Sequence, residues 1–251
     1  MSLRGRLTMG TMRGCQKSFE GRDLSEAVFW GVDLSRATFR DVLLKDVRIS
    51  HAMLIDVDID AFVDRVVING VDVTQYVNEG DPWYPLRGML RPADPAAMRA
   101  TWTALEQEWS ETISRARRLT EDQLHESVGG EWSFVDTLRH LVFAMDKWFT
   151  VPILGASTFH PYGLTNTGSA GLDWPGLDRS STPSLDEIVA VRDQRATSFR
   201  EFLQTLTADE LDREVDVLEN GIVPIRECVF TVFEEEFHHN RYAIRDLEQL
   251  H

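Results

Sequence analysis

The side chains best suited to metal chemistry lie near the C-terminus, in the run Glu234-Glu235-Glu236-Phe237-His238-His239. Glu236 and His239 are three residues apart, so on a helix they project together, an arrangement that helical bundles use to hold divalent metals. Glu235, four residues before His239, can compete for the same role. His140 would supply a third ligand from another helix. Three protein ligands leave open positions for water or substrate, as a catalytic rather than a structural metal site requires.

The surrounding pattern predicts how a helix presents these side chains. One face of this helix is apolar and consists of Ile225, Val229, Val232, Phe233, Ala243, Ile244, Leu247 and Leu250. Glu236 and Asn240 fall inside that face, and His239 falls on its margin. A carboxylate on a core face is costly unless it is paired or binds a cation. Glu236 is therefore expected to have a partner.

Two interpretations of that partner remain open. In the first, His140, Glu236 and His239 bind one divalent metal, with Glu235 as the alternative carboxylate. In the second, Glu236 forms an ion pair with an arginine such as Arg241 or Arg139, and the histidines are solvated. His140 lies roughly 120° from the centre of the apolar stripe on its own helix, so it is not simply a core residue.

The elements that position these residues begin at recognisable caps. Asp94 precedes Pro95, and Ser133 and Ser184 each have an acidic residue three positions later. These signals predict long helices near residues 95–118, 133–152, 184–206 and 224–249. A connection rich in glycine and proline, from about 153 to 183, is longer than two packed helices need, and loops of this length in compact domains are often functional or mobile. The expected architecture is a four-helix bundle with a long crossover that covers one end.

The first third of the chain has a different period. A large apolar residue recurs every five positions from Phe19 to Ile59, and a small one precedes each by two positions from Ala27 onward. Neither a helix nor a strand has this period. Stretches such as Ala27-Val28-Phe29 and Val32-Asp33-Leu34 resemble the pentapeptide-repeat family, which implies a squared right-handed β-helix. Only about two coils are present, so we expect a scaffold or spacer that needs a neighbour.

The segment after the repeats predicts a small terminal cap. Residues 66–73 read as a strand, an Asn-Gly turn and a short second strand. Residues 80–94 are rich in glycine and proline and predict a linker. The fold class is therefore α+β and multidomain: a pentapeptide-repeat β-helix with its strand cap in 1–79, the linker, and a helical bundle in 95–251.

Residues 95–250 resemble the DinB or YfiT-like superfamily of bundle metalloproteins. The likeness rests on Gly130-Glu131-Trp132-Ser133, Leu138-Arg139-His140-Leu141 and Glu235-Glu236-Phe237-His238-His239 with the residues that follow. It implies one divalent metal, most often zinc or nickel, with His140 as the ligand from the second helix. The family's usual second ligand, a histidine, is replaced here by glutamate. The final ligand falls at His239 or, one register later, at Asn240, which is a poor ligand for zinc.

The same resemblance implies a class of activity. Characterised members of the superfamily are thiol-dependent transferases, isomerases and hydrolases that use a low-molecular-weight thiol such as mycothiol or bacillithiol. The expected function is therefore a metal-dependent transferase or hydrolase with a small-molecule substrate and a thiol cosubstrate. The alternative is a non-catalytic binding or scaffold protein with a degenerate metal site, in which the repeats mediate interactions.

Composition limits the partners further. The 251 residues carry 41 acidic and 26 basic side chains, a net charge of -15 that disfavours nucleic acid and anionic membranes. Cys15 and Cys228 match no metal spacing or redox pair, which fits a reducing compartment, although one bridge between them is an open alternative. No run approaches the ~18 apolar residues of a membrane span. We expect a cytoplasmic protein, and the short solenoid leaves room for a homodimer.

Overall fold

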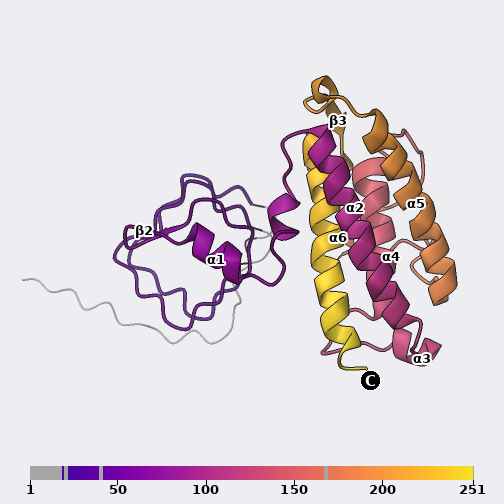
Figure 1. Ribbon diagram of the computed structural model, residues 1–251, viewed down its shortest axis with the longest axis horizontal. Helices are drawn as coiled ribbons and strands as arrows, with labels where there is room; N and C mark the ends of the chain where they lie inside the picture. The colour runs from indigo at the N-terminus through magenta and orange to yellow at the C-terminus, as the bar shows by residue number, and fades with distance from the viewer. Residues whose placement is uncertain (1–18, 20–21, 40–41, 167–168, 251) are drawn as a thin grey trace, which may run out of the picture. The chain divides into compact units, whose positions relative to one another are not determined.

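The computed structural model describes residues 19, 22–39, 42–166 and 169–250 (Figure 1). The chain divides into two compact units, residues 1–58 and 59–251. The expected domain limits at residues 79 and 95 stay predictions. Cys15 lies outside the described residues, whereas Cys228 is a free, buried cysteine in the core of the second unit.

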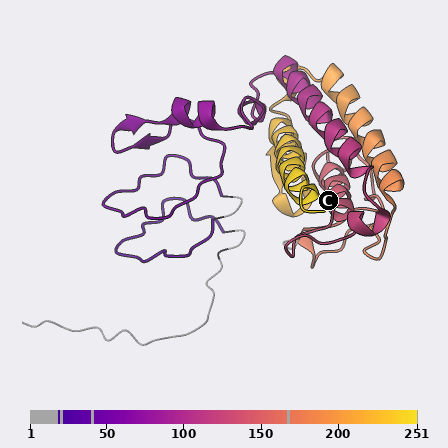
Figure 2. The same cartoon turned by 60° about the horizontal axis from the view of Figure 1, so that its bottom comes forward.

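The first unit repeats one turn at an interval of ten residues. Asp23 and Asp33 each accept a hydrogen bond from the main-chain nitrogen two residues later, both at 2.9 Å. Glu26 and Arg36, three positions after each aspartate, have left-handed φ angles of 63° and 64°. Ten residues are two five-residue repeats, so the same turn returns as the chain winds through the successive coils seen in Figure 2.

The large central residues of these repeats are substantially exposed. From Leu24 to Ile59 their side chains are 45% to 70% exposed. A solenoid residue is covered by the coils stacked above and below it, and with about two coils each has a neighbour on one side at most. No strand is present among the described residues of this unit.

The predicted hairpin after the repeats is confirmed. β1 (Val67–Ile68) pairs with antiparallel β2 (Val71–Asp72). Asn69 and Gly70 connect them with φ angles of 52° and 84°, and two positive φ values are what a tight type I′ turn requires. The short helix α1 (Thr74–Gly80) follows, and then a 3-10 turn, η1 (Arg87–Met89), in the segment predicted as linker.

The long helices begin where the caps predicted. Asp94 accepts a hydrogen bond from Ala97 at the start of α2 (Pro95–Ala116), and Ser133 does the same for Asp136 at the start of α4 (Phe134–Met145). Ser184 and Glu187 form a reciprocal capping box on α5 (Leu185–Thr205). The last helix is α6 (Ile225–Leu247). With α1 and the single-turn α3 (Glu121–Leu124), the described residues contain six α-helices rather than four.

The four longest helices enclose the core of the second unit. α2 packs on α5 and α6, and α4 packs on the same two helices, so the four run side by side around shared apolar side chains (Figure 1). One cluster of buried residues includes Trp102, Phe149, Phe199 and Phe233, and a second includes Trp109, Leu138, Leu141, Ile188 and Leu247. This packing fixes the facing sides of α4 and α6.

Three features of this unit had no counterpart in the sequence-based expectation. α4 continues into one turn of π-helix, η2 (Asp146–Thr150). A hairpin of β3 (Glu214–Asp216) and β4 (Ile222–Pro224) leads into α6, with short 3-10 turns η4 (Ala208–Glu210) and η5 (Leu218–Asn220) around it. The crossover between η2 and α5 is tied to α4 by a main-chain hydrogen bond from Leu164 to Arg139. Within the described residues, no helix combines the length and apolar composition needed to cross a membrane.

Candidate metal centre

Three consecutive glutamates of α6 face three different environments, because successive helix residues point about 100° apart. Glu234 lies 2.9 Å from a guanidinium nitrogen of Arg91. Glu236 is 4% exposed and lies 2.7 Å from Arg192 of α5. Glu235, between them, faces imidazoles and no guanidinium: its ion-pair partners among the described residues are His140 and His239.

His140, Glu235 and His239 form a compact cluster. Oε2 of Glu235 lies 3.3 Å from Nε2 of His140 and 3.4 Å from Nδ1 of His239. The two imidazole rings have centroids 4.8 Å apart. One potential ligand atom from each residue lies within 4.8 Å of the other two, a spacing that a single metal ion could bridge.

Nδ1 of each imidazole also lies within hydrogen-bond distance of a main-chain carbonyl oxygen. Nδ1 of His140 lies 3.0 Å from the carbonyl oxygen of Leu164 in the crossover. Nδ1 of His239 lies 3.0 Å from the carbonyl oxygen of Glu235, one turn earlier in α6. A carbonyl only accepts hydrogen bonds, so these contacts favour the Nδ1–H form of both rings and leave each Nε2 with a lone pair.

Trp132, just before α4, covers one side of the cluster. Its ring centroid is 4.6 Å from that of His140 and 6.1 Å from that of His239. The cluster is consequently bounded by an indole ring as well as by the crossover, while Glu235 retains 26% of its side-chain exposure. The site is thus partly open rather than sealed in the core.

The surroundings set the charge state of the cluster. Burial alone would raise the pKa of the Glu235 carboxyl, but its contact with His140 and the electrostatic influence of the neighbouring imidazoles outweigh burial and hold the pKa below its ordinary value. Burial, and then the neighbouring His140, lower the pKa of His239 to about 4. Near neutral pH, therefore, Glu235 is ionised and His239 is neutral, which are the forms that bind metals.

The carboxylate preferred from the sequence lies outside this cluster. Glu236 is buried as the helical wheel predicted, but Arg192 supplies its partner, while burial raises the pKa of Glu236 and Arg192 opposes that rise. The expected ion pair of Glu236 with an arginine is present, although neither Arg241 nor Arg139 is the partner, and His140 is buried rather than solvated. Glu235, the alternative, is the carboxylate that the structure brings to His140 and His239.

The two candidates for the last ligand position, His239 and Asn240, have different surroundings. Asn240 is 3% exposed, and its side-chain nitrogen donates a hydrogen bond to Oγ1 of Thr112 on α2. It therefore points away from the cluster, whereas His239 points into it.

Two contacts near the cluster were not predicted from the sequence. They are the contact of the Leu164 carbonyl with His140 and the ion pair of Arg192 with Glu236. A main-chain oxygen has no sequence signal, and one arginine among many does not reveal which carboxylate it reaches.

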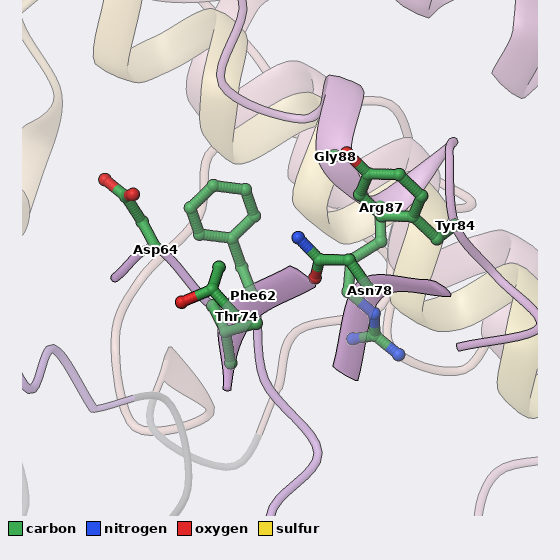
Figure 3. A pocket seen from close by; sticks show the side chains of 8 residues that line it. Phe62, Asp64, Thr74, Asn78, Tyr84, Arg87 and Gly88 are labelled. Carbon is green, nitrogen blue, oxygen red and sulfur yellow. The ribbon is translucent and has the colours of Figure 1, made fainter. Parts of the chain in front are cut away.

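A shallow pocket elsewhere in the second unit is a weaker candidate. It has a volume of about 200 Å³, and Figure 3 shows side chains that line it, including Phe62, Asp64, Thr74, Asn78, Tyr84 and Arg87. Its lining contains no histidine or cysteine. The charge of Arg87 is already balanced by Asp60 and Asp81. The imidazole–carboxylate cluster is the better candidate for chemistry.

Comparison with known families agrees with this placement. Residues 104–243, more than half of the chain, match the DinB superfamily, and this stretch includes all three residues of the cluster. The chain belongs to the DinB superfamily. Residues 23–59 match eight copies of the pentapeptide repeat, so the order of domains expected from the sequence is confirmed. Searches among curated proteins and among solved structures gave no match.

Membership of the DinB superfamily is consistent with the donor set. Proteins of this superfamily are generally metal-binding, and the chain brings two imidazoles and one carboxylate to the facing sides of α4 and α6. Imidazole nitrogen and carboxylate oxygen are both ligands that zinc and related divalent ions accept. The residues present therefore fit a divalent metal ion.

Proposed function

We propose that the DinB domain binds one divalent metal ion, zinc or nickel, through His140, Glu235 and His239. The observation that carries this proposal is the environment of Glu235. Its neighbours in the chain, Glu234 and Glu236, are each matched with an arginine, whereas Glu235 faces two imidazoles. A partly buried carboxylate without a guanidinium or ammonium partner is costly unless a cation compensates it.

The hydrogen bond of His140 strengthens the argument. If Nδ1 donates to Leu164, the lone pair of Nε2 faces an oxygen of Glu235 at 3.3 Å. Two acceptors at that distance repel each other unless a proton or a metal ion lies between them. A metal ion satisfies all three side chains together.

We propose further that the protein is a metal-dependent transferase or hydrolase acting on a small molecule, with a low-molecular-weight thiol such as mycothiol or bacillithiol as cosubstrate. A divalent ion in this site would supply Lewis-acid chemistry, which favours the ionised form of a bound thiol or water. Three protein ligands leave positions for such a group. Trp132 covers one side of the cluster, so it would restrict the directions from which a substrate approaches.

In this account the first unit is a short right-handed β-helix that acts as a scaffold or interaction module. The repeated turns at ten-residue intervals and the eight repeat copies support it. Its described residues present no cluster of metal ligands. The catalytic role therefore falls to the DinB domain alone.

A cobalt-substituted protein tests the activity class. Cobalt(II) bound by a thiolate gives a near-ultraviolet charge-transfer band that cobalt(II) bound by nitrogen and oxygen lacks. Titration of the untagged cobalt protein with bacillithiol or mycothiol should produce that band in the wild type but not in His140→Ala. If cobalt binds and no band develops with either thiol, the thiol part of the proposal is wrong and hydrolysis is the remaining activity. If cobalt does not bind at all, the non-catalytic scaffold is supported.

A further inference from the structure

The crossover contacts α4 next to the candidate metal centre through three hydrogen bonds. Nε of Arg139 donates to the carbonyl oxygen of Tyr162 at 3.1 Å, and the main-chain nitrogen of Leu164 donates to the carbonyl oxygen of Arg139 at 3.1 Å. Nδ1 of His140 completes the set, 3.0 Å from the carbonyl oxygen of Leu164. Residues 162–164 are therefore tied to α4 at the helix residue next to the ligand and at the ligand itself.

Arg139 is itself held on two sides. It is 5% exposed, and its Nη1 lies 3.0 Å from Oδ1 of Asp136, one turn earlier in α4. Oδ2 of Asp136 in turn lies 3.0 Å from Oγ of Ser133, the N-cap of the helix. A buried guanidinium with a carboxylate on one side and a carbonyl on the other has little rotational freedom. Its orientation thus fixes the position of the crossover relative to α4.

We propose that Arg139 is a positioning residue: by clamping residues 162–164 to α4, it places the Leu164 carbonyl so that His140 is held as the Nδ1–H tautomer with Nε2 turned toward Glu235. The expected effect of Arg139 on metal affinity rests on the proposed function, whereas its expected effect on the His140 tautomer does not. A ligand histidine whose second nitrogen is oriented by a carbonyl is more basic and better placed, and loss of such support commonly weakens metal affinity about 10–100-fold.

The first experiment measures the tautomer without any metal. Two-bond ¹H–¹⁵N correlation spectra of metal-free protein labelled with ¹⁵N-histidine distinguish the Nδ1–H from the Nε2–H form of a neutral imidazole ring. The His140 signals are assigned by their disappearance in His140→Gln. The wild type should show the Nδ1–H pattern. A dominant Nε2–H pattern in the wild type overturns the proposal, and this result needs no Arg139 variant that folds.

The second experiment compares two matched arginine variants. Arg139→Met keeps the apolar stem but removes the clamp, so it should give mixed His140 tautomers and a zinc affinity about 10–100-fold lower. Arg99→Met is the control, because Nη1 of Arg99 also donates to a carbonyl, that of Leu203 at 3.1 Å, but between α2 and α5. The control should keep both the tautomer and the zinc affinity of the wild type.

The two outcomes separate this inference from the proposed function. If Arg139→Met folds and retains the pure Nδ1–H form, or retains the zinc affinity of a zinc-binding wild type, the positioning role is wrong. If the wild type binds no zinc, the metal proposal fails, and the tautomers of the wild type and of Arg139→Met alone decide the role of Arg139.

Discussion

Glu234, Glu235 and Glu236 share one chemical group but not one role. The direction in which each points from α6 selects its neighbour, and the neighbour determines whether the carboxylate forms an ion pair or joins the imidazole cluster. Burial alone does not identify a ligand: Glu236 is the most buried of the three, yet Arg192 neutralises it. The side chains that a glutamate contacts, rather than how deeply it is buried, distinguish the candidate metal ligand.

A pair of isosteric variants separates the two carboxylates. Glu235→Gln should lower zinc affinity by about 100-fold or more, because a carboxylate ligand is lost. Glu236→Gln should leave zinc affinity within a few-fold of the wild type and lower the free energy of unfolding by about 2 kcal/mol, because the buried hydrogen bond to Arg192 loses its charge. Calorimetric zinc titration and urea unfolding measure the two effects. Loss of zinc binding in Glu236→Gln with retention in Glu235→Gln would contradict the assignment.

The depressed pKa of His239 predicts a pH dependence for the metal-free protein. Its pKa is about 4 in the folded state against an ordinary value of 6.5, so the unfolded chain binds the proton more tightly. Stability from this residue is fully present above pH 6.5 and is lost as the pH falls toward 4, by on the order of 2–3 kcal/mol. Urea unfolding across this range should show the decline. His239→Gln is the control, and an equally steep decline in this variant would rule out His239 as its source.

Most residues of the cluster could be predicted from the sequence. The spacing of Glu235 and His239 on one helix, together with the superfamily resemblance of His140, identified the groups that the structure places together. The sequence favoured Glu236, whereas the structure brings Glu235 to the two imidazoles, a difference that a helical wheel cannot show because it describes one helix only. It shows that Glu236 enters the core, but not that an arginine from α5 meets it there.

At the scale of elements, helix starts are local and could be predicted, whereas short tertiary features could not. The caps at Asp94, Ser133 and Ser184 depend on a side chain and a main-chain nitrogen three residues later. The hairpin of β3 and β4 has strands of three residues each, too short for any periodicity. The π-helical turn after α4 is stabilised by long-range partners, such as Arg195 of α5 for Asp146.

The crossover has a glycine whose replacement should be damaging. Gly176 has a φ of +90°, and a Cβ there would lie 2.6 Å from the carbonyl oxygen of Phe159. Gly155, in the same crossover, has a φ of +76° but open space around it. Gly155→Ala should cost about 1 kcal/mol from the backbone conformation alone, and Gly176→Ala a further 1–3 kcal/mol from the clash. Urea unfolding of both variants measures the difference, and equal losses would show that the turn at Gly176 relaxes freely.

At the scale of the whole molecule, the two halves follow different rules. The five-residue period and the matched repeat copies predicted the first unit as a short solenoid, although not the exposure of its central residues. The second unit has an apolar core between α2, α4, α5 and α6 that does not include the candidate metal centre. Its fold is therefore expected to persist without metal.

Chelation tests that expectation. Removal of metal from the purified protein should lower the melting temperature by only a few degrees, because binding contributes to the folded state without creating its core. The far-ultraviolet circular dichroism should be retained after chelation. Collapse of the helical signal on chelation would instead show that metal binding and folding are inseparable.

The proposed activity depends on His140, Glu235 and His239 together holding one metal ion. The most direct test of this binding is the zinc content of the untagged protein after equilibrium dialysis against buffered zinc. We expect one zinc ion per chain in the wild type and a loss of that ion in each of His140→Ala, Glu235→Ala and His239→Ala. A wild type without zinc, or folded variants that keep a full equivalent, would contradict it.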